Sequence, residues 1–304
     1  MTRPTRVLIT GAGGQVGVDL VSWLGANPPP GADPRWQPDG RGVTSDEFEV
    51  LALSRHELDV TDAASIRRSF EMARPDVVVH LAAYTAVDQA ENDVDQCFRV
   101  NADATGFLSA ASNDVGAHFV AVSTDYVFDG EKGAAYVETD EPHPLNVYGA
   151  SKWGGEQRCS GHDTIVRTSW VMGVRGRSVV HVIADRARSG ATVRFVVDQT
   201  GTITLAADLA RALVTVVRER PGGVWHVANE GATTWFDLAR FVGLNLGRGE
   251  AFAEAITTEQ LVPPPLATRP RRSDLDTTKW HARWGGLPDW RAGVERLLSD
   301  RHAS

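Results

Sequence analysis

The sequence predicts an α/β protein built around a doubly wound parallel sheet, and two observations carry this prediction. Short runs of β-branched and other apolar residues recur along the chain, and longer stretches with apolar residues at the helical period lie between them. The runs are apolar almost throughout, which is typical of parallel strands with helices on both faces. Their alternation with helices predicts right-handed βαβ units.

The individual elements follow from these patterns in chain order. Strands are expected at residues 6–10, 50–54, 76–81, 118–123, 164–167, 193–197 and 224–227. The clearest helices are expected at residues 63–73, 94–114, 205–218 and 235–246. We expect a main domain over residues 1–170, followed by a smaller lobe over residues 171–304. This lobe would mainly bind a substrate and would be interleaved with returns to the main sheet.

Residues 25–47 interrupt the alternation. They contain several glycines and five prolines, a composition that cannot propagate a helix. The segment is predicted to be a loop inserted between the first helix and the second strand, most simply a mobile surface excursion. A lid or an oligomer contact is the alternative.

Composition and charge exclude several classes of protein. The 304 residues, 42% of them hydrophobic, suffice for a buried core, while a formal net charge of -8 disfavours a nucleic-acid partner. Cys97 and Cys159 stand in unrelated contexts, which fits a reducing compartment better than a disulfide or metal framework. No apolar run is long enough for a signal-peptide core or a membrane span, so we expect a cytoplasmic protein without a membrane partner.

The first strand runs directly into a glycine-rich turn. Gly11, Gly14 and Gly17 follow the apolar residues 7–10, and a helical pattern begins at Gln15. Glycine lets the backbone turn sharply and approach a pyrophosphate, and the helix N-terminus offers free N–H groups. A strand, a glycine turn and a helix in this order indicate a dinucleotide site in a Rossmann-type fold. A tight structural turn is the alternative.

The end of the second strand bears on the choice of dinucleotide. An acidic residue there would bind the ribose 2′-hydroxyl of NAD. This chain has Ser54 and Arg55 instead, a hydroxyl and a cation suited to the 2′-phosphate of NADPH. Asp59 is a candidate for the adenine edge. We therefore expect NADPH as the cofactor and leave NADH open, with a solvated strand-end charge as the alternative for Arg55.

A tyrosine and a lysine carry the predicted chemistry. Tyr148 and Lys152 lie one helical turn apart, on one face of a predicted helix. A free phenol is too weak an acid to donate its proton efficiently at neutral pH, and a nearby ammonium together with an oxidised nicotinamide would lower its pKa. Ser123 and Thr124 end a buried strand and are candidates to hold a ketone oxygen. The alternative is an exposed tyrosine and lysine on a helix surface.

Three stretches extend beyond a generic carbonyl reductase. They are residues 74–88 (RPDVVVHLAAYTAVD), residues 123–130 (STDYVFDG) with 144–152 (PLNVYGASK), and residues 167–171 (RTSWV) with 198–201 (DQTG). Together they resemble the dTDP-4-dehydrorhamnose reductase family of extended short-chain dehydrogenases, over nearly the whole chain. The resemblance implies reduction of a dTDP-linked 4-keto-6-deoxy sugar with NADPH or NADH.

Site residues follow from the resemblance by position. It implies that Gly14, Gln15 and Val16 bind the cofactor diphosphate. It implies that Asp59 and Val60 bind the adenine end, and that Ala82, Ala83 and Tyr84 bind the middle of the cofactor. It implies that Thr124 and Asp125 meet the sugar, that Thr124 tunes the phenol, and that Trp170 lies on the substrate side. We add Arg269 for the nucleotide diphosphate, since a guanidinium suits phosphate; a surface arginine is the alternative.

Several features depart from the family pattern. Met172 stands where a tyrosine is expected and Ile203 where a proline is expected, both on loops predicted to shape the sugar pocket. One branch of the family, dTDP-dihydrostreptose synthase, makes a ring-contracted pentose from the same keto sugar, and it is therefore an alternative. A non-catalytic dinucleotide-binding regulatory subunit and an epimerase are the others.

Metal binding is not expected. Some members of the family hold a divalent metal at a dimer contact through acidic residues, and Asp19 falls near one such position. The sequence offers no full ligand set, so Asp19 is predicted to be an exposed aspartate on the first helix. A homodimer stays open.

Overall fold

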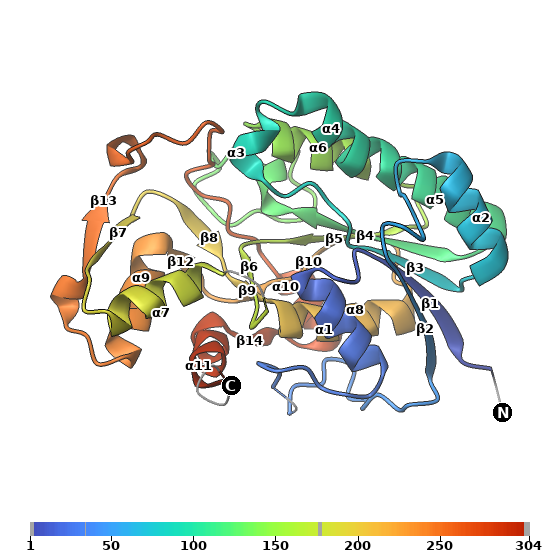
Figure 1. Ribbon diagram of the computed structural model, residues 1–304, viewed down its shortest axis with the longest axis horizontal. Helices are drawn as coiled ribbons and strands as arrows, with labels where there is room; N and C mark the ends of the chain where they lie inside the picture. The colour runs from blue at the N-terminus through green and yellow to red at the C-terminus, as the bar shows by residue number, and fades with distance from the viewer. Residues whose placement is uncertain (1–2, 34, 176–177, 301–304) are drawn as a thin grey trace.

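A six-stranded parallel sheet forms the centre of the protein (Figure 1). The computed structural model describes residues 3–33, 35–175 and 178–300, apart from the side chain of residue 300. The strand order is β10-β5-β4-β3-β1-β2. The strands are β1 (Thr5–Thr10), β2 (Phe48–Leu53), β3 (Val77–His80), β4 (His118–Thr124), β5 (Thr164–Thr168) and β10 (Gly223–His226). The predicted α/β fold with a Rossmann-type sheet is confirmed.

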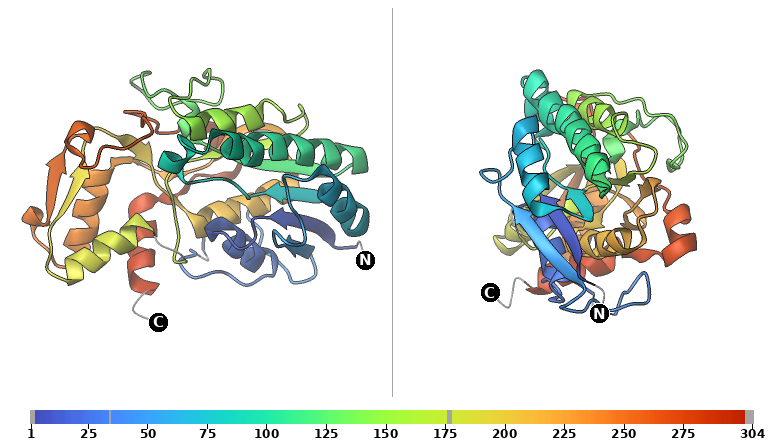
Figure 2. Two further views of the ribbon diagram at one scale, coloured as in Figure 1. Left: turned by 45° about the horizontal axis from the view of Figure 1, so that its top comes forward. Right: turned by 90° about the vertical axis from the view of Figure 1, so that its right-hand side faces the viewer.

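Helices cover both faces of this sheet (Figures 1 and 2). Helices α1 (Gln15–Leu24) and α8 (Ala206–Glu219) pack on one face, and α2 (Ala63–Ala73), α5 (Ala104–Val115) and α6 (Val147–Glu156) pack on the other. Successive residues of β1 serve opposite faces, so that Ile9 packs with Leu20 of α1 while Leu8 packs with Phe70 of α2. This two-sided burial explains why the strands are apolar throughout.

The second half of the chain builds a smaller group of elements beside the sheet. Four two-stranded pairings lie there: β6 (Val171–Met172) with β9 (Thr204–Leu205), β7 (Val193–Val196) with β13 (Ala253–Ile256), β8 (Thr200–Thr202) with β12 (Ala232–Thr234), and β11 (Asn229–Glu230) with β14 (Leu287–Asp289). Helices α7 (Val179–Arg188), α9 (Trp235–Asn245) and α11 (Trp290–Asp300) share one core with β6, β7, β9 and β13. Helix α10 (Thr278–Trp284) instead packs against β10 of the main sheet. The predicted strand at residues 193–197 thus exists outside the main sheet. Helix α8 and strand β10 return to the main sheet, while a division near residue 170 stays a prediction.

The helix expected at residues 94–114 is present without a gap, but one of its inner turns is π-helical. Helix α4 (Val94–Phe98), which follows the short α3 (Val87–Ala90), is joined to α5 by a π-helical turn at Arg99–Asp103. Such a turn inserts an extra residue and re-aims a side chain. Here the buried Asn101 donates to the carbonyl of Tyr84 (3.0 Å) and to Ser151 Oγ (2.9 Å).

The insertion at residues 25–47 is packed against the body of the protein. Asp39 forms ion pairs with Arg211 and Arg218 of α8, and all three side chains are at most 4% exposed. The Trp36 indole donates to the carbonyl of Gly286 at 2.9 Å. The prediction of a mobile surface excursion is therefore wrong: buried charges and an aromatic anchor fix this segment.

Two further expectations concern the cysteines and the membrane. Cys97 and Cys159 are free thiols, and Cys97 is buried. Across the described part of the chain, none of the helices has both the length and the apolar character required to span a bilayer.

Candidate active site

The strand order reverses between β1 and β3, and the predicted phosphate loop lies at this point. Gly11 follows β1 and adopts φ +69°. A Cβ atom there would stand 2.5 Å from the backbone nitrogen of Ala82, just beyond β3, and one on Gly17 would stand 2.3 Å from the carbonyl oxygen of Gly11. Glycine is therefore required at both positions, and the crevice at a reversal of this kind is where α/β sheets bind ligands.

The N-terminus of α1 opens into the same crevice. Its N-cap, Gly14, is extended, and no described side chain caps it. The buried Oε1 of Gln15 has no hydrogen-bond partner among the described residues, and Val16 follows it in the first turn. A Cβ atom on Gly13 would meet nothing within 4 Å. Uncapped N–H groups and open space fit a dinucleotide pyrophosphate.

The residues after β2 were predicted to hold the adenosine end of a cofactor. Ser54 and Arg55 are exposed. Asp59 accepts hydrogen bonds from the backbone N–H and the hydroxyl of Thr61 (2.9 and 2.7 Å), and these bonds hold the pKa of its carboxyl below its usual range. The carboxylate is thus oriented and ionised next to Val60.

Tyr148 lies in the first turn of α6 because Asn146 starts that helix. The Asn146 side chain accepts from the backbone N–H of Gly149 at 2.8 Å, as an N-cap residue should. Tyr148 is hydrogen-bonded to Thr124, the last residue of β4. Lys152, one turn further along α6, is buried and donates to the carbonyl of Val122 at 2.6 Å. The three predicted catalytic residues are thus brought together at the carboxyl edge of the sheet.

Burial sets the protonation states of the two groups in the ligand-free protein. Burial raises the pKa of Tyr148 to about 12, against the opposing effect of Thr124. Burial also lowers the pKa of Lys152 to about 8. The expected lowering of the phenol pKa involves a bound oxidised nicotinamide and stays a prediction. The phenol is held fully protonated, as a proton donor must be before the reaction.

Asp125 faces the protein rather than open space. It is 2% exposed and receives hydrogen bonds from Ser273 (2.5 Å) and Thr124 (3.1 Å). Burial raises the pKa of its carboxyl to about 6 in spite of these bonds. Asp125 thus contacts Thr124 on one side and Ser273, from the far end of the chain, on the other.

Trp170 is held in a strained conformation. Its φ of +41° lies in the left-handed region, its ring stacks on Trp235 at 3.9 Å between centroids, and a Cβ atom on Gly201 would come within 2.6 Å of that ring. Strain of this kind persists only where the surroundings enforce it, and it concentrates at functional sites.

Arg269 is fixed by two partners at the edge of a cavity. Its guanidinium pairs with Asp88 at 2.5 Å and is hydrogen-bonded to Tyr126, whose ring packs edge-on against Tyr148. The Arg269 pair holds the pKa of Asp88 at about 2. The cavity has a volume of about 530 Å³ and is also lined by Gln199, Trp235 and the proline-rich segment 263–265.

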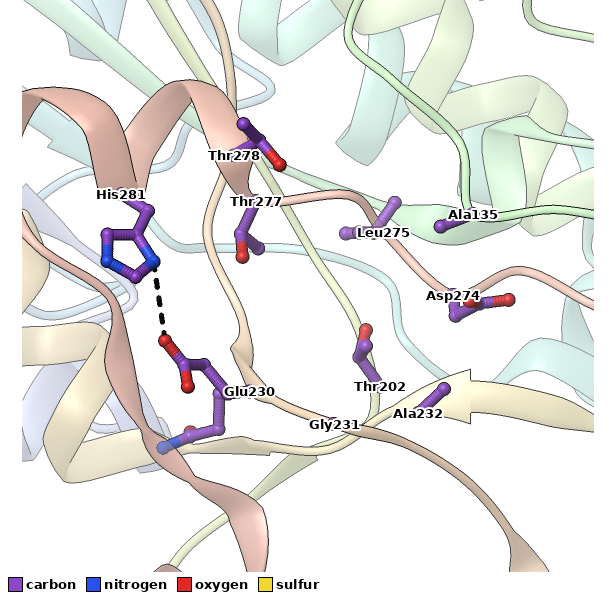
Figure 3. Close-up of a pocket in the computed structure, with 11 residues that line it drawn as sticks. Ala135, Thr202, Glu230, Gly231, Ala232, Asp274, Leu275, Thr277, Thr278 and His281 are labelled. Carbon is purple, nitrogen blue, oxygen red and sulfur yellow. Dashed lines mark ion pairs between the residues drawn. The ribbon is translucent and has the colours of Figure 1, made fainter.

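A second cavity, of about 420 Å³, contains none of the predicted site residues (Figure 3). Glu230 and His281 approach one another across its rim, with 3.5 Å between the carboxylate and Nδ1. Thr202, Thr277 and Asp274 line the remainder.

The comparison with known proteins decides the family. A family model described as the RmlD substrate binding domain matches residues 41–302. The chain belongs to the RmlD family. It is 36% identical to the dTDP-4-dehydrorhamnose reductase of Burkholderia thailandensis, over 97% of this chain and 98% of that protein. It is 34% identical to the dTDP-4-keto-6-deoxy-D-glucose reductase of Streptomyces niveus, over 90% of each. The crystal structure of the dTDP-4-dehydrorhamnose reductase from Bacillus anthracis, in complex with NADP, superimposes with a TM-score of 0.86 at 30% identity. The match covers 98% of this chain and 100% of that one.

Three residues of this RmlD-family chain that were predicted to line a pocket or to be exposed are instead buried. Met172 and Ile203 are 2% and 0% exposed and pack in the core of the C-terminal elements, so they do not face a pocket. Asp19 is buried rather than exposed, and burial raises the pKa of its carboxyl to about 6 despite the nearby Arg175. Among the described residues, no three histidine, cysteine or acidic side chains gather in an arrangement that could hold a metal.

Several residues of the candidate site were not predicted from the sequence. Asn101 and Asp93 hold Tyr84 through its backbone N–H (2.8 Å) and its hydroxyl (2.7 Å). Asp88 and Ser273 hold Arg269 and Asp125. A polar residue inside the helical pattern at residues 94–114 was the one signal available for Asn101.

Proposed function

We propose that this protein reduces the keto group of a dTDP-linked 4-keto-6-deoxy sugar, dTDP-4-dehydro-L-rhamnose, at C4. Its hydride donor is NADPH, and NADH is a second donor. The observation that carries the proposal is the joint position of Thr124, Tyr148 and Lys152 beside the glycine loop. Relatives named for this reaction over nearly the whole chain support it. The two free thiols favour the cytoplasm as its location.

Tyr148 acts as the general acid in this proposal. The bound dinucleotide supplies a hydride to the carbonyl carbon. Tyr148 then gives its proton to the carbonyl oxygen, so that the C=O group becomes CH–OH and the phenol becomes phenolate. The Thr124 hydroxyl and the Lys152 ammonium stabilise this phenolate, which burial alone disfavours. Lys152 is one helical turn from Tyr148, within reach of a nicotinamide ribose.

The cofactor residues are assigned by the crevice that they line. We assign the pyrophosphate to the loop from Gly11 to Gly17 and to the N-terminus of α1, where the N–H groups are uncapped and the space beside Gly13 is open. The adenine end falls to Asp59 and Val60, and the middle of the cofactor to Ala82, Ala83 and Tyr84.

The substrate side is assigned to the elements across the cleft. Trp170 offers a rigid aromatic wall and Arg269 a fixed cation for the nucleotide diphosphate. Both carboxylate oxygens of Asp125 already have protein donors, so we assign Asp125 to the orientation of Thr124 and not to direct contact with the sugar.

One incubation tests the proposal. The protein is mixed with dTDP-4-dehydro-L-rhamnose and NADPH, NADPH oxidation is followed by absorbance, and the product is identified by NMR. Stoichiometric oxidation with formation of dTDP-rhamnose is expected. A ring-contracted pentose would identify the dihydrostreptose branch, turnover without net NADPH consumption an epimerase, and NADPH binding without turnover a regulatory protein. Each of these three outcomes contradicts the proposal.

Replacement of Gly11 by alanine tests the phosphate loop. Gly11→Ala is expected to weaken NADPH binding by about 10- to 100-fold, from roughly 1–3 kcal/mol of backbone strain and from contact with the Ala82 backbone. Isothermal titration calorimetry measures this. Gly116→Ala is the matched control, since Gly116 has φ +74° but open space around it. Equal NADPH affinity in the two variants would contradict the assignment.

Replacement of Arg55 by alanine tests the choice of cofactor. Loss of a charged hydrogen bond to the 2′-phosphate, roughly 1.5–3 kcal/mol, should raise the dissociation constant of NADPH by about 10- to 100-fold. The NADH constant should stay nearly unchanged. Arg67→Ala, at an exposed arginine of α2, should change neither constant. If Arg55→Ala raised the dissociation constants of NADPH and NADH equally, Arg55 would not bind the 2′-phosphate.

A further inference from the structure

A buried ion pair lies behind the proposed catalytic centre. Glu156, the last residue of α6, and Arg167 of β5 have side chains only 2% and 3% exposed. The Arg167 Nε lies 3.1 and 3.2 Å from the two carboxylate oxygens, and its NH2 lies 2.7 Å from Oε2. The hydroxyl of Ser123, on β4, donates to Oε1. Buried pairs of this kind are weak sources of net stability, because desolvation offsets their attraction.

The pair is placed to act on Lys152. Glu156 follows Lys152 by four residues, so the two side chains project from the same face of α6. The Lys152 ammonium donates to the carbonyl of Val122, and the Glu156 carboxylate accepts from the next residue, Ser123. The ammonium and the carboxylate thus contact neighbouring residues of β4. Both lie inside the protein, where charges interact more strongly than in water.

We propose that Glu156 is a positioning residue for the reaction: held by Arg167 and Ser123, its carboxylate keeps the Lys152 ammonium protonated beside Tyr148. This inference rests on the proposed function, in which Lys152 must carry a positive charge to stabilise the phenolate. Ser123 enters as a holder of the carboxylate rather than as a ligand of the ketone.

The other groups around Lys152 do not supply that negative charge at neutral pH. Burial lowers the pKa of His80 to about 3, and it raises the pKa of the Cys97 thiol and, to about 12, that of the Cys159 thiol, so all three are neutral. The groups that face the immediate neighbours of Lys152 are Glu91 near Cys97, Asp163 near Cys159, and Asp125 and Tyr126 near Tyr148. Glu156 is the carboxylate that acts on Lys152 itself.

The sign of the effect follows from the charges. Burial lowers the pKa of Lys152 to about 8, and the Glu156 charge counteracts this. In Glu156→Gln the counteracting charge is lost and the Arg167 cation is left uncompensated, so the Lys152 pKa should fall by about one unit or more. Ketone reduction needs protonated Lys152. The alkaline limb of the pH profile of kcat, where kcat falls as Lys152 loses its proton, should therefore move to lower pH by the same amount. At pH values above this limb, kcat should be about tenfold lower than in the wild type.

Companion variants separate charge from structure. Glu156→Asp keeps the charge and should hold the alkaline limb near its wild-type position. The double variant Glu156→Gln with Arg167→Gln removes both charges and should return the limb toward that of the wild type, although the site is altered twice. Glu219→Gln, at an exposed glutamate of α8, should leave the limb in place.

The pKa of Lys152 can be measured directly, in an experiment that needs no turnover. The chain has three lysines, Lys132, Lys152 and Lys279, so ¹⁵N labelling of the lysine amines and NMR titration of the ligand-free protein isolate the Lys152 signal. A lower Lys152 pKa in Glu156→Gln that is restored in the double variant is the expected result. An unchanged pKa in Glu156→Gln, or an equal shift in the double variant, overturns the inference. Failure of the wild type to reduce the keto sugar would instead count against the proposed function, since the titration does not depend on it.

Discussion

Replacing Tyr148 by phenylalanine should reduce kcat for keto-sugar reduction by roughly 10²- to 10⁴-fold, the range that general acid catalysis contributes. The change removes the phenol oxygen that is bonded to Thr124 and leaves the ring that packs against Tyr126. NADPH affinity should stay close to that of the wild type, because the glycine loop and α1 are untouched. Single-turnover kinetics with NADPH absorbance measure the loss, and calorimetry measures the binding.

Tyr136→Phe is the matched control for this experiment. The Tyr136 hydroxyl donates to Asp129 at 2.7 Å and accepts from the backbone of Gly130, away from the catalytic residues. Its loss should lower the free energy of unfolding but not the kcat of folded protein. Wild-type turnover in Tyr148→Phe, or an equal loss of kcat in both variants, would exclude Tyr148 as the proton donor.

The main sheet could be predicted because its strands carry a signal that depends on few partners. Successive strand residues such as Ile9 on one face and Leu8 on the other are both apolar because helices cover both faces. The structure contains every predicted strand within about two residues. Pairing was not predictable for residues 193–197. Their partner β13 (Ala253–Ile256) has two exposed residues and lacks the apolar signature of a buried strand.

The site was predictable where glycine or a fixed spacing carries the chemistry. Gly11 and Gly17 admit no side chain, and Tyr148 and Lys152 are one turn apart on any helix. The supporting contacts could not be predicted, because they join residues far apart in the chain: Ser273 with Asp125 across 148 positions. The π-helical turn at Asn101 was missed because a helical period does not register one inserted residue.

Charged residues gave the most misleading signal, and the insertion shows why. Asp39 lies among prolines and glycines, a composition typical of exposed loops, yet its carboxylate is buried between two arginines of α8. These arginines stand on an otherwise apolar helix face, with Arg211 over the ring of Trp23 and Arg218 over that of Phe48. Asp39 is 172 positions from Arg211 and 179 positions from Arg218, so the local sequence around Asp39 does not indicate its partners.

This arrangement predicts that Asp39→Asn destabilises the fold by about 3–5 kcal/mol, the usual cost of leaving a buried charge without its partner. Arg211 loses its carboxylate, while Arg218 keeps Glu47. The destabilisation is a large part of the roughly 5–15 kcal/mol by which domains are stable. Urea unfolding followed by circular dichroism measures the loss. Asp46→Asn, at an exposed position of the same insertion, should change the free energy of unfolding by less than about 0.5 kcal/mol. Equal unfolding curves for Asp39→Asn and Asp46→Asn would mean that the ion pairs of Asp39 do not stabilise the fold.

The pH dependence gives an independent check on the same pair. Burial raises the pKa of Asp39, but Arg218 and Arg211 outweigh it, so the carboxyl titrates below its usual range. A group whose folded-state pKa is depressed contributes stability above its unfolded-state pKa of about 3.9, and this contribution is lost as the pH falls through the folded-state value. The stability gap between wild type and Asp39→Asn should therefore be full at neutral pH and narrow below about pH 4. A gap that stays constant down to acid pH would show that Asp39 acts through packing and not through its charge.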